Sequence, residues 1–206
     1  MKVLLINTGW LADSGKLSCF IQDMPVAVTA KISSAKNQAR KREIASGYFL
    51  LCRASEMFGM PAYGKNLNVG IHGKPYIYGG PEYNISHCEN VAVCVCDRNP
   101  IGIDVQKISG YKRGVARKMF TENEQKMVEN KDVKFTLLWS LKEAYGKMTG
   151  EGLSEKTAMT DFSSLLKEEP YENESLGNVF FTVKRAGDFL ITVCTAQREK
   201  MEFVIY

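Results

Sequence analysis

The stretch at 135–152, FTLLWSLKEAYGKMTGEG, is the part of this sequence from which the fold is best predicted. Its apolar residues recur every three or four positions, which predicts an amphipathic helix with one buried stripe. That stripe consists of Leu137, Leu141, Ala144 and Met148. Glu143 and Lys147 lie one helical turn apart on a neighbouring polar face. Two interpretations are open: a Glu–Lys pair on a solvated face, or two charged groups that point into a site.

The composition is that of a folded globular protein. Of 206 residues, 45% are hydrophobic and 24% are charged, values that exclude the disordered and fibrous classes. The net charge of +4 is too small to indicate nucleic acid as the main partner, but it suits an anionic ligand or an acidic protein. We find neither a signal-peptide core nor an apolar run of membrane-spanning length, and the six cysteines lack zinc-site spacing. We therefore expect a cytoplasmic protein with no membrane or nucleic acid partner.

Strand and helix patterns alternate in the first hundred residues. Residues 3–6 predict a strand, 26–32 a less certain second element, and 33–58 a long helix with Ser33 or Ser34 as its N-cap. A basic cluster occupies the first turns of that helix: Lys36, Arg40, Lys41 and Arg42. The cluster is either a solvated basic face or a phosphate-binding helix end.

Two apolar runs near the middle of the chain, 91–96 and 101–106, each predict a strand. The turn residues between them predict that the two strands form a β-hairpin. In the second strand Asp104 and Gln106 face the side opposite to the apolar residues, because strand side chains alternate. A carboxylate in the middle of an apolar strand is costly unless it is exposed or has a partner, and a metal ion is one such partner.

The remaining patterns complete the expected domain organisation. A basic helical piece is expected within 107–120, and Thr121 and Glu124 form the ends of a capping-box pattern that opens a short helix. Strands are expected at three further places: 179–183, 189–194 and 203–206. The order of elements predicts an α+β protein of two similar halves, residues 1–100 and 101–206.

Three motifs, taken together, resemble the 4'-phosphopantetheinyl transferases of the monomeric type that activates peptide and polyketide synthetases. They are NISH at 84–87, GIDVQ at 102–106 and WSLKEAYGK at 139–147. In that family a (V/I)G(I/V)D(I/V)E strand is followed by W(S/C)xKEAxxK on a helix, and this chain is similar in both the order and the gap. The resemblance extends upstream to Gly73-Lys74-Pro75.

The resemblance implies a fold and a reaction. The fold consists of two pseudo-symmetric α/β halves, each a small antiparallel sheet packed with a long helix, with the active site in the cleft between them. The reaction transfers the 4'-phosphopantetheine arm of coenzyme A to a serine of an apo acyl- or peptidyl-carrier protein and releases 3',5'-ADP. A monomer is implied, with nucleotide contacts in the N-terminal half and the metal and catalytic residues in the C-terminal half.

The same resemblance assigns roles to individual residues. Asp104, Gln106 and Glu143 are the expected Mg²⁺ ligands, because this ion prefers oxygen donors together with substrate phosphates. Glu143 is expected to act as base for the attacking serine, directly or through water, while Lys147 holds a phosphate and His87 donates to the diphosphate. The residues expected to contact the coenzyme are Lys41, Arg42, Lys74, Pro75, Ser86, His87, Asp104 and Lys147.

Gln106 departs from the family pattern, which usually has a second acid there. The lost negative charge predicts weaker metal binding, and it motivates an alternative function as a coenzyme A- or carrier-binding protein with weakened catalysis. A different metal-dependent phosphotransferase is disfavoured because the sequence lacks a GxxxxGK[ST] loop.

Two further residue roles are expected. Glu124 either caps a helix or approaches the metal. A basic cluster is expected to meet an acidic carrier: Lys112, Arg113, Arg117 and Lys118.

Overall fold

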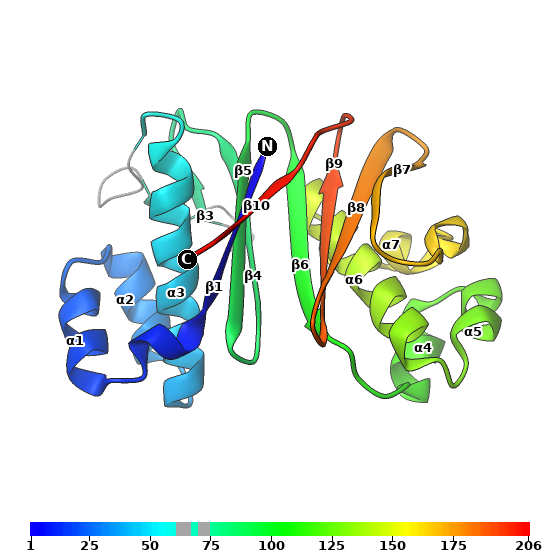
Figure 1. Cartoon of the computed structure of the whole chain (residues 1–206), viewed down its shortest axis with the longest axis horizontal. Helices are drawn as coiled ribbons and strands as arrows, with labels where there is room; N and C mark the ends of the chain where they lie inside the picture. The colour runs from blue at the N-terminus through cyan, green and yellow to red at the C-terminus, as the bar shows by residue number, and fades with distance from the viewer. Residues whose placement is uncertain (61–66, 70–74) are drawn as a thin grey trace. The chain divides into compact units, whose positions relative to one another are not determined.

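The computed structural model describes residues 1–60, 67–69 and 75–206. The chain divides into two units, shown in Figure 1 and described separately here. Unit 1 comprises Met1–Asn99 and Met201–Tyr206, and unit 2 comprises Pro100–Lys200. The end of the chain was expected in the second half, but its last strand lies in the sheet of unit 1.

Unit 1 contains a four-stranded sheet of order β10-β1-β5-β4. The strands are β1 (Lys2–Asn7), β4 (Glu82–Cys88), β5 (Val91–Asp97) and β10 (Glu202–Ile205). β10 pairs in parallel with β1, whereas β5 pairs antiparallel with both β1 and β4. The predicted hairpin of 91–96 with 101–106 is therefore wrong, because neighbours within unit 1 occupy both edges of β5. Its turn residues Asp97 and Asn99 still form a local bend, in which the Asp97 Oδ1 accepts from the Asn99 N–H at 2.7 Å.

The long helix of unit 1, α3 (Gln38–Glu56), packs against the sheet (Figure 1). Its N-cap is Asn37, whose side chain accepts a hydrogen bond from the Arg40 N–H at 2.8 Å. The predicted caps are wrong because Ser33 ends a separate helix, α2 (Val26–Ser33), and Ser34 is the C-cap of that helix. The less certain element at 26–32 is thus helical. The shorter elements of this unit are η1 (Thr8–Leu11), α1 (Ser14–Gln22), β2 (Leu67–Val69) and β3 (Pro75–Ile77).

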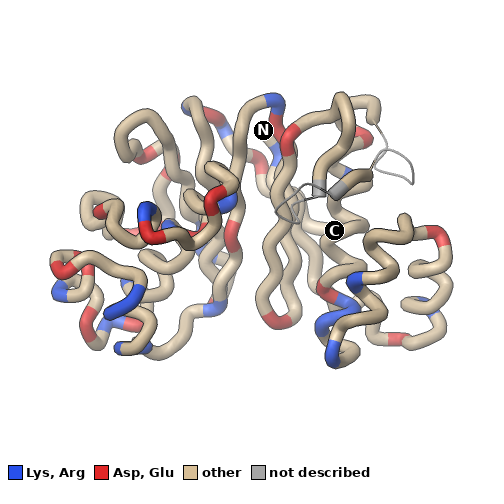
Figure 2. Tube along the Cα trace, turned by 180° about the vertical axis from the view of Figure 1, so that it is seen from behind, with Lys and Arg blue, Asp and Glu red and all other residues tan. Residues whose placement is uncertain are grey.

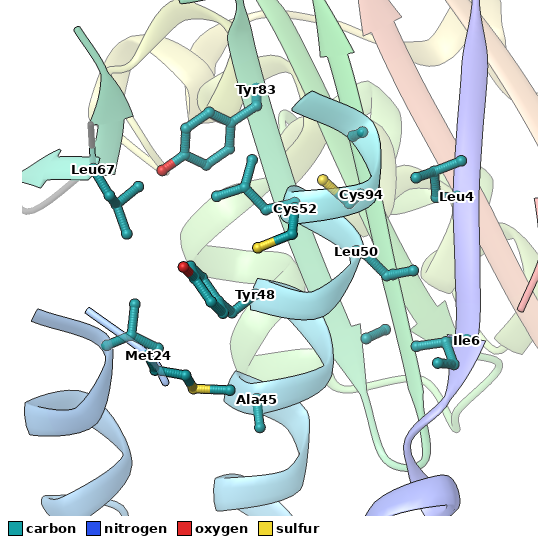
Figure 3. Packing of buried hydrophobic residues seen from close by; sticks show 14 of the residues in the cluster. Leu4, Ile6, Met24, Ala45, Tyr48, Leu50, Cys52, Leu67, Tyr83 and Cys94 are labelled. Atoms are coloured by element: carbon teal, nitrogen blue, oxygen red, sulfur yellow. The ribbon is translucent and has the colours of Figure 1, made fainter. Parts of the chain in front are cut away.

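The core of unit 1 surrounds α3. Figure 3 shows Leu50 of this helix pointing toward Leu4 and Ile6 of β1. The neighbouring side of the helix carries Tyr48, which faces the region of Tyr83 from β4 (Figure 3). All five of these side chains are buried, so α3 is held by apolar contacts on more than one side.

Unit 2 contains an antiparallel sheet of order β6-β9-β8-β7. Its strands are β6 (Ile101–Lys107), β7 (Tyr171–Leu176), β8 (Val179–Ala186) and β9 (Phe189–Thr195). The predicted helix at 135–152 is confirmed as α6 (Asp132–Thr149), which packs on β6 and β9 (Figure 1). Gly150 ends α6 with φ of 76°, the left-handed conformation that favours glycine. The shorter helices are α4 (Arg113–Met119), α5 (Glu122–Val128), α7 (Glu155–Met159) and η3 (Ser163–Leu165).

The chain is therefore α+β, with a four-stranded sheet and a long helix in each unit. The expected pseudo-symmetry and cleft stay predictions. Within the described ranges, no helix combines the length and the apolar character needed to span a membrane. All six cysteines lie in those ranges, and none of them forms a disulfide bond.

Candidate active site

Strand β6 approaches helix α6 so closely that one position of the strand must be glycine. A Cβ atom added at Gly102 would collide with the backbone carbonyl oxygen of Ala144. Gly102 therefore permits backbone contact between the two elements. This contact sets β6 against the helix that carries Glu143 and Lys147, and it explains the first residue of the GIDVQ motif.

Asp104 of β6 and Lys147 of α6 form a largely buried ion pair. The Asp104 side chain is 1% exposed, and its Oδ1 atom lies 2.7 Å from the Lys147 Nζ atom. The same Nζ atom donates to the carbonyl oxygen of Ile103 at 3.1 Å. The partner required by a carboxylate in an apolar strand is thus, in this structure, a lysine from the facing helix.

Glu143 lies one helical turn before Lys147 and is half-buried. Burial raises the pKa of the Glu143 carboxyl group; Lys147 lowers this pKa, and Asp104 raises it. The three charged groups therefore act on one another within unit 2. A glutamate with a raised pKa is a stronger base than an ordinary one, which suits proton transfer near neutral pH.

Gln106 is half-buried and lies two residues beyond Asp104 on β6. It lines a small cavity, called here the Trp139 cavity, whose walls are Gln106, Ser109, Lys112, Val115, Phe135, Thr136 and Trp139. Trp139 precedes Glu143 by one turn of α6. The helix that carries the charged residues therefore forms part of the cavity wall.

The donor set of β6 and α6 fits a hard divalent cation. Asp104 and Glu143 offer carboxylate oxygens and Gln106 an amide oxygen, the ligand types that Mg²⁺ prefers. Across the described residues, however, no group of three or more His, Cys, Asp or Glu side chains is placed to hold a metal ion. Substrate phosphates or water would have to complete the coordination shell.

Glu124 and Lys142 form a second ion pair, which is fully buried: both side chains are 0% exposed and their charged atoms lie 3.1 Å apart. Glu124 closes the predicted capping box with Thr121, and its Oε1 atom accepts from the Phe162 N–H at 2.7 Å. Lys142 also donates to three carbonyl groups between Thr157 and Thr160. Burial lowers the pKa of Lys142, while Glu124 raises it.

These contacts give Glu124 a structural role in the cap and the ion pair. They also account for the lysine of the KEA sequence, to which the sequence analysis assigned no role. Lys142 fixes the segment after α7 to the helix that carries Glu143.

Unit 1 holds a separate polar cluster around His87 of β4. A guanidinium nitrogen of Arg40 lies 2.8 Å from the His87 Nδ1 atom and 3.1 Å from the Glu43 Oε2 atom. The Glu43 Oε2 atom is itself 3.4 Å from His87 Nδ1. These residues line what we call the His87 cavity, which also includes Lys31 and Tyr48. Three basic side chains and one carboxylate, that of Glu43, line this cavity, so basic groups are in excess and suit an anionic group.

The predicted coenzyme contacts of unit 1 fall at different places. Lys41 and Arg42 are half-buried on α3 but are not among the residues that line the His87 cavity. Ser86 is buried in β4 opposite Val93. Lys74 lies outside the described residues, and Pro75 begins β3, where its side chain is not described.

Two basic residues that line the His87 cavity were not predicted from the sequence as site residues. Arg40 was recognised only as a member of the basic cluster, and Lys31 was assigned to the less certain second element. Helical spacing could have indicated Arg40 as a cavity residue. Arg40, Glu43 and Gly47 share one face of α3, and all three line the cavity.

The structure thus brings Asp104, Glu143 and Lys147 together on β6 and α6. A carboxylate pair beside a lysine defines a class of site that can bind a divalent cation together with phosphate groups. Comparison with known proteins agrees: the family model of the 4'-phosphopantetheinyl transferase superfamily matches residues 100–194. This region of the chain is thus similar to that superfamily, in agreement with the motifs.

Individual relatives are also named as phosphopantetheinyl transferases. The chain is 34% identical over 123 residues to a 4'-phosphopantetheinyl transferase of Bacillus subtilis, covering 56% of this chain and 54% of the relative. It is 37% identical over 87 residues to the 4'-phosphopantetheinyl transferase gsp of Aneurinibacillus migulanus, covering 40% and 37%. A third relative is the L-aminoadipate-semialdehyde dehydrogenase-phosphopantetheinyl transferase of Saccharomyces cerevisiae, 25% identical over 181 residues, covering 79% and 66%. The chain spans about half the length of several curated relatives that it matches.

Proposed function

We propose that this chain is a 4'-phosphopantetheinyl transferase, which moves the phosphopantetheine arm of coenzyme A to a serine of an apo acyl- or peptidyl-carrier protein. The observation that carries this proposal is the grouping of Asp104, Glu143 and Lys147 within the region that the superfamily model matches. The proposal includes the monomeric state and cytoplasmic location expected from the sequence.

In the proposed reaction the serine oxygen attacks the phosphorus atom that carries the pantetheine chain. A new P–O bond forms to serine, and the bond from this phosphorus to the oxygen of the nucleotide phosphate breaks, so 3',5'-ADP leaves with the electron pair. Glu143 takes the serine proton, directly or through one water molecule. Its raised pKa supports this role. Lys147 supplies a cation for phosphate oxygens.

We propose Mg²⁺ as the metal, held by Asp104, Glu143 and Gln106 together with the diphosphate. When bound, it would neutralise the charge that develops on the diphosphate oxygens as the P–O bond breaks. Oxygen-only donors on β6 and α6 support this choice over softer metals.

For the nucleotide part of coenzyme A, we propose contacts from unit 1. Arg40, Lys31 and His87 line one cavity and suit a phosphate group. Arg40 is therefore our main candidate for a phosphate contact in α3, ahead of Lys41 and Arg42. Ser86, Lys74 and Pro75 remain predicted coenzyme contacts.

The carrier protein is proposed to dock near Lys112. Of the four basic residues predicted for this role, Lys112 lines the Trp139 cavity beside the helix of Glu143. Arg113 and Arg117 instead line a different cavity with Glu122 and Glu129, where acidic side chains offset their charge. Figure 2 shows the interspersed basic and acidic positions of this unit.

Intact-mass spectrometry of an apo carrier protein, incubated with this chain, coenzyme A and Mg²⁺, tests the proposal. We expect the carrier to gain the mass of one phosphopantetheine, and a carrier whose acceptor serine is replaced by alanine to gain nothing. If several carriers gain no mass while calorimetry shows coenzyme A bound, the alternative of a coenzyme A- or carrier-binding protein with weakened catalysis is favoured. Gln106 is the observation that motivates this alternative.

A further inference from the structure

The charged site of unit 2 carries its own counter-ion. The carboxylate of Asp104 is already in contact with the ammonium group of Lys147 at 2.7 Å. The Lys147 Nζ atom is held in addition by the backbone carbonyl of Ile103. A divalent cation that approaches Asp104 therefore meets a positive charge next to its ligand, and like charges at short range repel strongly where solvent is scarce.

The polar side chains of this site together carry little negative charge to attract a free cation. Gln106 is neutral, so among the side chains of Asp104, Gln106, Glu143 and Lys147 only one formal negative charge is in excess when both carboxyl groups are ionised. Affinity for divalent cations rises with the number of charged ligands, so this set is poor for binding a metal unaided.

We propose that Lys147 is an internal counter-ion that keeps free divalent cation out of the site, so that metal and diphosphate are taken up together. A diphosphate brings negative charge for the metal and, at the same time, phosphate oxygens to which Lys147 can move from Asp104. Metal binding then depends on a diphosphate-bearing ligand. This inference rests on the proposed function in taking coenzyme A as that ligand.

Thermodynamic linkage makes the inference quantitative. If coenzyme A tightens metal binding by some factor, the metal must tighten coenzyme A binding by the same factor. A nucleotide that lacks the diphosphate provides a matched comparison. We choose 3',5'-ADP, which keeps the nucleotide phosphates but has a single phosphate at its 5' position.

The test is a titration of Mn²⁺ against the purified chain, followed by electron paramagnetic resonance of the free ion. We expect Mn²⁺ to bind at least about ten times more tightly when coenzyme A is saturating than when the chain is free, a coupling of common size. The Mn²⁺ bound by coenzyme A in solution is measured separately and subtracted. With 3',5'-ADP we expect a clearly smaller enhancement.

Lys147→Met tests the residue responsible, and Gln106→Glu tests the low negative charge of the ligand set. Lys147→Met removes the counter-ion, and we expect Mn²⁺ to bind this free variant roughly tenfold more tightly than the free wild-type chain. Gln106→Glu adds a charged ligand and leaves the ion pair in place, so it should shift the affinity in the same direction even if Lys147→Met folds poorly. Lys156→Met, which removes an exposed ion pair with Glu151 in the same unit, serves as control and should bind Mn²⁺ as the wild type does.

Equal Mn²⁺ affinity with and without coenzyme A would overturn the inference, as would wild-type Mn²⁺ affinity in folded Lys147→Met. These results are separable from failure of the proposed function. A chain that modifies carriers but binds free Mn²⁺ tightly contradicts only the role of Lys147. If coenzyme A does not bind, the proposed function fails, and the free variants still decide whether Lys147 excludes the metal.

Discussion

Proton transfer in this chain is proposed to depend on one side chain, Glu143. Burial raises its pKa, so the carboxyl group keeps its proton to a higher pH than an ordinary glutamate, whose pKa is about 4.3. Since a base must be unprotonated before it accepts a proton, the active form is lost as the pH falls through this raised pKa.

The first prediction concerns the pH dependence of kcat/KM for carrier modification. We expect its acid limb to lie above pH 4.3, the ordinary glutamate value. Lys147 lowers the pKa of Glu143, so in Lys147→Met the acid limb should move to still higher pH. A series of initial rates from pH 4.5 to 8, taken where the fold is intact, measures both. An acid limb that stays in place in Lys147→Met would argue against Glu143 as the titrating group.

At the scale of elements, the contact between β6 and α6 positions the catalytic candidates, and Gly102 permits it. In Gly102→Ala the new methyl group meets the carbonyl oxygen of Ala144, which is backbone and cannot rotate away. We expect a loss of about 1–3 kcal/mol in the free energy of unfolding, as for other overpacked sites, and a marked loss of activity in the folded fraction. Urea denaturation and initial rates measure the two effects.

Gly114→Ala is the matched control for Gly102→Ala. Gly114 lies in α4, and a Cβ atom there would meet nothing within 4 Å. Because alanine favours helices more than glycine does, this control should be unchanged or more stable by up to about 1 kcal/mol. If both variants retained wild-type stability, close packing at Gly102 would not be needed.

The buried pair of Glu124 and Lys142 is expected to hold elements together without taking part in the chemistry. Lys142→Met leaves the Glu124 carboxylate buried without its cation, which typically costs about 3–5 kcal/mol. The double variant with Glu124→Gln should recover part of this loss, and a double-mutant cycle on unfolding free energies measures the coupling. Additive single effects would show that the pair is not coupled in solution.

Elements with a strong local pattern could be predicted from the sequence, and their pairing could not. The stripe of α6 and the capping box at Thr121 depend on spacing within one segment, and both are present. The hairpin of 91–96 with 101–106 was wrong because a strand can take a neighbour on either edge: β4, which directly precedes β5, occupies one edge of β5, and the distant strand β1 occupies the other. The turn residues between two strands do not determine which strands occupy the edges of each one in the sheet.

The candidate site shows the same difference: its residues could be predicted from the sequence, but their contacts could not. Asp104, Glu143 and Lys147 could be selected from their residue types and the family motifs. Their pairing could not, because the contact of Asp104 with Lys147 joins residues 43 positions apart in sequence. Arg40 was missed because a run of basic residues on one helix does not reveal which member faces the cavity until the packing of α3 is known.

At the scale of the whole molecule, recognition of a carrier protein is expected to depend on charge near the Trp139 cavity. Lys112→Glu should raise the KM for an acidic carrier at low ionic strength and weaken its salt dependence, because an attractive charge becomes repulsive. Lys118→Glu makes the same charge change in α4 at an exposed residue that does not line the cavity. Equal effects of the two variants would indicate a general charge effect and remove Lys112 as a specific contact.

The most direct test of the central claim, that Glu143 performs the chemistry of phosphopantetheine transfer, is to measure the single-turnover rate and the melting temperature of Glu143→Gln together. Glutamine keeps the size of the side chain but cannot accept the proton, so the rate should fall by about 100-fold or more. The melting temperature should not fall, because the change removes a carboxyl group whose ionised form burial disfavours. A transfer rate within a few-fold of the wild type would contradict the assignment of Glu143.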